Sequence, residues 1–250
     1  MLRKLNRQLE KMMPLITPTS VIIGVLLADF FDDYTSFIPW IFAFMTFSGS
    51  LSSNFHSLKD TFFHPLPLFL VFFILHILMP VWAWSIGLFT FSGDTYTITG
   101  LVLAMAIPTG ISSFIWVTIY RGNISLTLSI ILIDTFLSPF IVPFTLSLLV
   151  GEKVEMDVFS IMKGLTGMIV IPSLIGMFLN QVTKGKVNDG LSPRLAPFSK
   201  IGMALVVMIN GAVVSPFLRN IDMKLISITI TVFGIAFTGY MFSFLMDEKY

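Results

Sequence analysis

Pro108 and Gly110 lie inside an apolar stretch, "AIPTGISSF", that contains no charged residue. Proline removes a backbone hydrogen-bond donor and glycine relaxes the chain, so neighbouring carbonyls and amides lose their helical partners. In hydrocarbon each unsatisfied backbone group costs several kcal/mol, and such a break persists only where protein, ions or water satisfy the freed groups. The sequence therefore predicts a broken helix with a polar environment at the break.

The residues that follow the break carry hydroxyl groups. They are Thr109, Ser112 and Ser113, and a helix resuming there would point its N-terminal amides at whatever occupies the break. We interpret the three hydroxyl groups as part of a ligand-binding or ion-binding site. A packing kink in which the hydroxyls bond back to their own helix explains the same residues, and the sequence leaves both interpretations open.

The next apolar segment contains Asp134, in "LSIILIDTFLSPF". A carboxylate at membrane depth costs at least ~2.5 kcal/mol, so this side chain should face the interior of the bundle. Thr127, seven residues earlier, and Ser138, four later, share its helix face, although Ile131 on the same stripe is apolar. We expect Asp134 and Thr127 to bind a cation, or Asp134 to exchange a proton. The alternative is a neutral carboxyl group that links helices through hydrogen bonds.

Two further polar residues lie in apolar segments. Asn210 is followed by Gly211, which permits close helix approach; the side chain either lines the substrate cavity or forms an interhelical hydrogen bond. A lone histidine such as His76 is more often packed than a ligand. The sequence contains no metal-ligand spacing, phosphate loop or nucleophile motif, so we expect neither a metal, nor an organic cofactor, nor an enzyme.

Composition identifies the environment of these residues. Of the 250 residues, 55% are hydrophobic and 12% are charged, and the mean hydropathy is +0.90. This is typical of a membrane protein, and continuously apolar runs predict an all-α polytopic transmembrane bundle rather than a barrel. A net charge of +1 gives no indication of nucleic acid, so the lipid bilayer is the expected surrounding partner. Eight spans are predicted, at residues 12–28, 34–58, 61–93, 95–120, 122–151, 164–183, 201–218 and 225–246.

The distribution of charged residues and an internal sequence similarity, called the echo below, predict the topology. Most of the 15 Lys and Arg residues fall on the side of the N-terminus, which indicates a multi-pass cell-membrane protein with a cytoplasmic N-terminus. "VIIGVLLADF" in the first span resembles "SLIGMFLNQV" in the sixth. The echo favours an inverted repeat within a single membrane domain, with five helices in residues 1–151 and a partial second repeat of three helices in residues 158–250.

Four blocks of sequence resemble the bile acid:sodium symporter family in order and spacing. They are "IPWIFAFMTFSGSLSSNF", "HPLPLFLVFFILHILMPVWAW", "PTGISSFIWVTIYRGNISLTLSIILIDTFLSPFIVP" and "NGAVVS". The resemblance implies a repeat of five plus five helices, a panel and a core domain, and discontinuous helices that cross beside sodium sites. It also implies secondary-active transport of a small organic anion, such as a bile acid, another carboxylate or a sulfonate, coupled to Na⁺ or H⁺.

The sequence departs from the family pattern where sodium ligands are expected. The family has a Ser-Asn pair where this chain has Ser113 and Phe114, and a glutamine where it has Leu75; the family's hydroxyl positions correspond to Thr127 and Ile131. A hard cation requires several oxygen ligands, so these apolar side chains argue against the usual sodium sites. Coupling to protons through Asp134 is our own inference rather than a family property.

A second departure concerns length. The family pattern continues with two further helices, including a second broken helix, so the fold expected here is an incomplete repeat and this chain alone should transport poorly. A non-transporting membrane scaffold, or a degenerate relative of the transporters, is the alternative function. Formation of a homodimer is left open.

Overall fold

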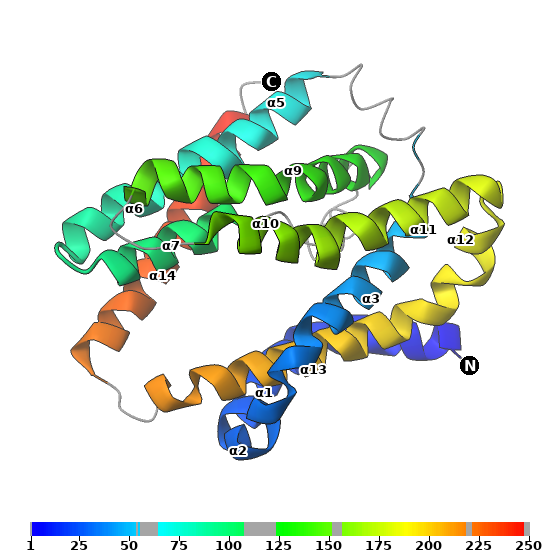
Figure 1. Ribbon diagram of the computed structural model, residues 1–250, viewed down its shortest axis with the longest axis horizontal. Helices are drawn as coiled ribbons and strands as arrows, with labels where there is room; N and C mark the ends of the chain where they lie inside the picture. The colour runs from blue at the N-terminus through cyan, green and yellow to red at the C-terminus, as the bar shows by residue number, and fades with distance from the viewer. Residues whose placement is uncertain are drawn as a thin grey trace.

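The computed structural model describes residues 2–53, 55, 65–107, 124–151, 157–218 and 222–247, and the regular elements in these ranges are helices (Figure 1). The first part contains α1 (Leu2–Leu26), α2 (Ala28–Phe31), the 3-10 helix η1 (Asp32–Phe37) and α3 (Ile38–Ser50). The middle contains α5 (Pro65–Phe73), the π-helix η2 (Ile74–Leu78), α6 (Met79–Thr90), α7 (Thr95–Ala106) and α9 (Ile124–Val150). The last part contains α10 (Val158–Leu165), the π-helix η4 (Thr166–Val170), α11 (Ile171–Val182), α12 (Lys186–Gly190), α13 (Ser192–Leu218) and α14 (Met223–Asp247).

The predicted all-α membrane bundle is confirmed. Within the described residues, 6 helices are long and apolar enough to cross a membrane: Lys4–Leu26, Leu66–Thr90, Ser129–Val150, Phe159–Val182, Ser192–Leu218 and Met223–Phe244. The other two predicted spans contain shorter helices, α3 with 13 residues and α7 with 12. Large apolar side chains such as Phe89, Tyr240 and Phe233 cover the outside, and a lipid environment accounts for that surface.

Helix α7 ends where the sequence predicts a break. Its last residue is Ala106, and Ile107 has extended backbone with ψ 137°. The ring of a proline disfavours helical backbone at the preceding residue, so Pro108 explains this ending. The fourth apolar segment is therefore not one helix from residue 95 to residue 120. The break itself, with Thr109, Ser112 and Ser113, lies outside the described residues.

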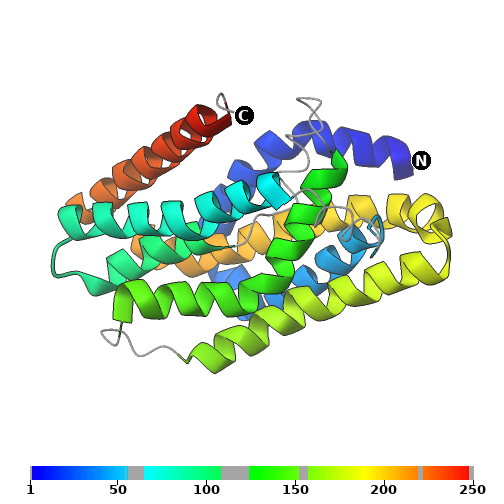
Figure 2. The same cartoon turned by 90° about the horizontal axis from the view of Figure 1, so that it is seen from above.

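The long helices pack in two groups (Figures 1 and 2). In one group α13 packs against α1 and α3, and α3 also packs against α11. In the other, α6 packs against α7 and α14, and α7 packs against α9. The helix formed by α10, η4 and α11 joins the groups, because α10 packs against α9 while α11 packs against α3.

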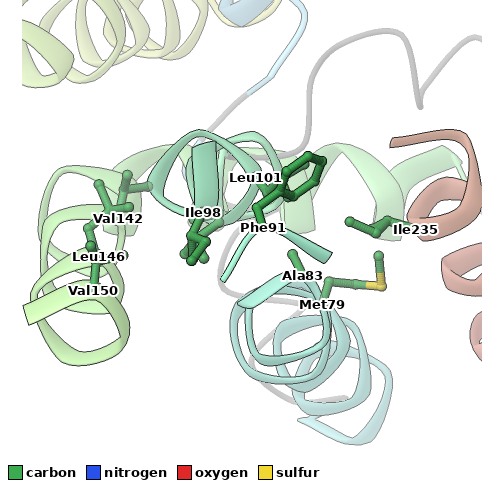
Figure 3. Close-up of a cluster of buried hydrophobic side chains, with 11 residues drawn as sticks. Met79, Ala83, Phe91, Ile98, Leu101, Val142, Leu146, Val150 and Ile235 are labelled. Carbon is green, nitrogen blue, oxygen red and sulfur yellow. The ribbon is translucent and has the colours of Figure 1, made fainter. Parts of the chain in front are cut away.

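A hydrophobic cluster holds the second group together (Figure 3). Ala83 of α6 and Val102 and Ala106 of α7 are completely buried in it. The cluster also contains residues of α9 and α14, namely Val142, Leu146, Val150 and Ile235. Helix α7, whose C-terminal end leads to Pro108, is thereby fixed between α6 and α9.

Glycines allow the closest helix crossings in the first group. A β-carbon on Gly24 of α1 would collide with the backbone of Met208 in α13, and one on Gly211 of α13 would lie 2.8 Å from the Val21 carbonyl oxygen of α1. The predicted close approach at Gly211 is therefore confirmed. A second crossing joins α11 to α3, where a β-carbon on Gly176 would lie 2.8 Å from the Phe47 carbonyl oxygen.

Gly24 and Gly176 are the glycines of the two similar sequences "VIIGVLLADF" and "SLIGMFLNQV". In an inverted repeat, α1 corresponds to α11 and α3 corresponds to α13. The contact of α1 with α13 would then be equivalent to the contact of α11 with α3, and a glycine of the echo lies at each contact. These equivalent positions support the predicted repeat boundaries, which remain a prediction.

Both π-helices stand directly before a proline in the second position of the next helix. η2 precedes Met79 and Pro80, and η4 precedes Ile171 and Pro172. Proline lacks the N–H group that would bond to the carbonyl four residues earlier. In a π turn a carbonyl accepts from the N–H group five residues later, so it does not need the missing donor. Each long helix consequently has an irregular turn inside it, and the first of these turns carries His76.

Candidate functional site

His76 and Asp134 form a buried pair. His76 Nε2 lies 2.6 Å from Asp134 Oδ1, and the two side chains are 7% and 0% exposed. One residue belongs to η2 and the other to α9, and α7 packs against both of these helices. The Phe72 ring lies 5.3 Å from the His76 ring, centroid to centroid. The pair therefore lies in the second group of helices, beside the helix that leads to the break.

The sequence analysis treated His76 as a packed residue and missed this pairing. A signal was present: an ionisable residue at membrane depth pairs with another polar group in nearly every case, and His76 and Asp134 are ionisable residues inside the third and fifth apolar segments. Their separation of 58 positions hides the contact from any argument based on local spacing.

Asp134 faces the protein interior, as predicted. It lies in α9, whose apolar window is 72% buried, whereas the corresponding windows of the other candidate spans are 11% to 33% buried. The surrounding helices shield a charged side chain in α9 from lipid. The free-energy cost of placing that side chain at membrane depth falls, because polar groups of the protein can reach it. The enclosed position keeps the Asp134 carboxyl group away from the bilayer.

Pro139 explains the role of Ser138. Without an N–H group on Pro139, the Thr135 carbonyl loses its helical donor. The Ser138 hydroxyl donates to that carbonyl at 2.8 Å, inside the buried part of α9. Ser138, which shares a face with Asp134 in sequence, is thus a structural residue, and the bend of α9 in Figure 2 is accounted for by Pro139 and Pro143.

The other positions that the family resemblance links to ion binding hold both polar and apolar side chains. Thr127 is half-buried and lies two turns before Asp134 on the same face of α9. Ile131 is 7% exposed and Leu75 is half-buried, so two positions that the resemblance assigns to oxygen ligands hold apolar side chains within the protein. Phe114 and Ser113 lie outside the described residues.

Asn210 lies apart from the His76–Asp134 pair. Its side chain is exposed, and Nδ2 donates to the Val206 carbonyl of its own helix at 3.0 Å. Helix α13 belongs to the first group of helices, whereas His76 and Asp134 belong to the second. Within the described residues this side chain bonds to its own helix rather than to another, and the packing contacts of this part of α13 are made by Gly211 and Ser215.

A model of the Sodium Bile acid symporter family matches residues 39–220, which include every described residue of this site. The chain belongs to this symporter family. It is 53% identical to the uncharacterized Bacillus subtilis protein YbaS over 236 residues, which are 94% of this chain and 77% of that protein. It is 27% identical over 154 residues to the rice protein BASS1 and 23% identical over 249 residues to the Arabidopsis thaliana protein BASS5, each described as a probable chloroplastic sodium/metabolite cotransporter. The chain covers 37% and 61% of those two plant proteins.

Membership in this symporter family, which consists of transporters and not enzymes, agrees with a multi-pass membrane protein. Two charged contacts join different helices. Lys224 Nζ lies 2.6 Å from Asp94 Oδ2, and Lys200 Nζ donates to Asn6 Oδ1 at 2.5 Å and lies 3.9 Å from Glu10 Oε2. The topology predicted from the sequence places the members of each contact on the same side of the membrane.

Proposed function

We propose that this chain takes part in secondary-active transport of a small organic anion, coupled to Na⁺ or H⁺. The observation that carries the proposal is Asp134, which has no exposed side-chain surface and is hydrogen-bonded to His76 of another helix. Ionisable side chains at membrane depth are expensive and mark ion or proton pathways in transporters. A purely structural helix contact needs no ionisable pair.

Family membership supports the class of activity. The plant relatives are described as probable sodium/metabolite cotransporters, and the family description names bile acids and sodium. We propose that Thr109 and Ser112 bind the anion at the start of the helix following the break, with Asn210 as a further substrate contact. Ser113, Thr127 and Asp134 would hold the coupling ion. The anion is a bile acid, another carboxylate or a sulfonate.

Two observations support H⁺ as the coupling ion within this proposal. A sodium ion needs several oxygen ligands, and the apolar side chains of Ile131 and Leu75 supply none. Asp134 and His76 both bind protons, so the pair supports coupling without a complete oxygen shell.

The second candidate is a membrane scaffold that does not transport. The same apolar residues at Ile131 and Leu75 support it, since a family member that has lost its ion ligands has no means of coupling. The two candidates differ in whether substrate uptake responds to an ion gradient.

Reconstituted liposomes test the proposal. Uptake of a labelled carboxylate or bile acid is measured with a sodium gradient and with a proton gradient, each imposed alone. We expect gradient-driven uptake that Asp134→Asn abolishes. Asp157→Asn is the matched control, because it makes the same chemical change at an exposed helix cap that asparagine also supports.

Uptake by the Asp134→Asn variant at the wild-type rate would exclude Asp134 from the mechanism. Absence of gradient-driven uptake of any carboxylate, bile acid or sulfonate tested would favour the scaffold. The elution volume of each variant in detergent confirms that it is folded before uptake is compared.

A further inference from the structure

The two nitrogens of the His76 ring have different surroundings. Nε2 contacts Asp134, whereas Nδ1 is buried and has no hydrogen-bond partner among the residues that the structure describes. Buried polar side-chain atoms without a partner are uncommon in proteins, and each one requires an explanation. Here the unpaired atom belongs to a side chain that is only 7% exposed and is directly bonded to the central carboxylate.

The pairing indicates where the ring hydrogen lies. An ionised Asp134 carboxylate only accepts hydrogen bonds, so Nε2 carries the hydrogen and Nδ1 has a free lone pair. The opposite arrangement, with a protonated Asp134 and a hydrogen on Nδ1, would bury a donor without an acceptor, which is the rarer defect in folded proteins. With Asp134 ionised, the two side chains together carry a charge of −1, and Nδ1 is an unused basic nitrogen.

We propose that His76 Nδ1 is the proton-binding atom of the transport cycle, and that once protonated it donates a hydrogen bond to the carboxylate or sulfonate of the substrate. This inference rests on the proposed function. One proton from water binds the Nδ1 lone pair, no electron is transferred, and the net charge of the pair changes from −1 to zero. The deprotonated pair repels an anion, whereas the protonated pair offers it a charged donor. Proton binding and anion binding therefore strengthen each other, which is the requirement for symport.

The described parts of the neighbouring helices carry few titratable side chains. η2 packs against α5, α6 and α7, and α9 packs against α6, α7, α10 and η4. In the described residues of these neighbours the other titratable side chains are Tyr96 and Lys163, and both are exposed. The placement of His76 in a π turn is also typical of functional positions in long helices.

Protonation of Nδ1 is measurable without any substrate. The chain has 3 histidines, so ¹⁵N-histidine spectra of the protein in detergent contain few signals, and His76→Gln identifies those of His76. We expect the Nδ1 signal to change from that of an unprotonated to that of a protonated nitrogen as the pH is lowered over the range in which the protein stays folded. Asp134→Asn should move the midpoint, and Asp157→Asn should not. A ring with unchanged Nδ1 signals across this range would overturn the proposal.

Uptake of pyruvate and of a bile acid in sodium-free liposomes tests the coupling. In His76→Gln, the glutamine amide can still donate a hydrogen bond to Asp134, but it binds no proton. We therefore expect uptake by this variant to fall about tenfold and to stop responding to pH. Thr238→Val is the control: it removes the 2.8 Å hydrogen bond to Trp82 in the same group of helices and leaves both titratable residues in place. We expect this control to keep the wild-type response to pH.

Two outcomes are separable. Wild-type uptake that follows only a sodium gradient and is unchanged in His76→Gln would overturn the proton site while the transport function stands. Uptake of neither probe under any gradient would contradict the proposed function, and the titration of Nδ1 would then decide alone whether His76 binds the proton.

Discussion

The hydroxyl of Ser138 donates to the Thr135 carbonyl at 2.8 Å, the same carbonyl that Pro139 deprives of its backbone donor. This side-chain bond keeps the buried part of α9 intact beside Asp134. It shows how a proline within the most enclosed candidate span is tolerated: the freed carbonyl is satisfied within the helix rather than by lipid.

We predict that Ser138→Ala lowers the free energy of unfolding by about 1 to 3 kcal/mol, because the buried Thr135 carbonyl is left without a donor. Thermal unfolding in detergent measures the loss. Ser147→Ala, on the exposed side of the same helix, is the control and should change stability by less than about 0.5 kcal/mol. Equal losses in the two variants would show that the bond to Thr135 contributes nothing.

The crossing of α1 and α13 yields a second prediction. Gly24→Ala places a methyl group against the Met208 backbone, so the helices must separate and the protein should lose about 1 to 3 kcal/mol of stability. Gly234→Ala introduces the same methyl group into α14, where no atom lies within 4 Å of it. The control should be neutral or slightly stabilising, since alanine favours helix over glycine. Similar melting temperatures for the wild type and Gly24→Ala would contradict the close crossing.

The third prediction concerns pH. Hydrogen bonds from Lys224 and Thr97 lower the pKa of Asp94 from 3.8 to about 2, because they favour the charged carboxylate. The folded value lies below the unfolded value, so this stabilisation is complete above pH 3.8 and is lost as the pH falls through about 2. The melting temperature of the wild type should therefore decline in acid more than that of Asp94→Asn, which lacks the titrating group.

The same comparison has a clear negative outcome. Asp94→Asn keeps a side-chain oxygen for the N-cap of α7 but loses the charge that pairs with Lys224. Parallel pH profiles of the two proteins from neutral pH to about pH 2 would show that the contact between Asp94 and Lys224 does not stabilise the fold.

Sequence by itself determined the elements. A backbone in lipid must satisfy its own hydrogen bonds, so long apolar runs become helices, and a proline inside such a run ends or bends the helix, as Ile107 shows directly before Pro108. The interior position of Asp134 followed from the cost of exposing a carboxylate to hydrocarbon, which does not depend on the details of packing.

Only the tertiary structure decided which polar residues meet. The helices are apolar on all sides, so the sequence does not indicate which face of a helix is covered by protein and which by lipid. Packing pairs His76 with Asp134 across 58 positions. It places Asn210 on an exposed face of α13, although Asn210 and Asp134 both stand in apolar surroundings in the sequence. The physical reason is that helix rotation in a membrane is set by contacts with other helices, and those contacts join segments distant in the chain.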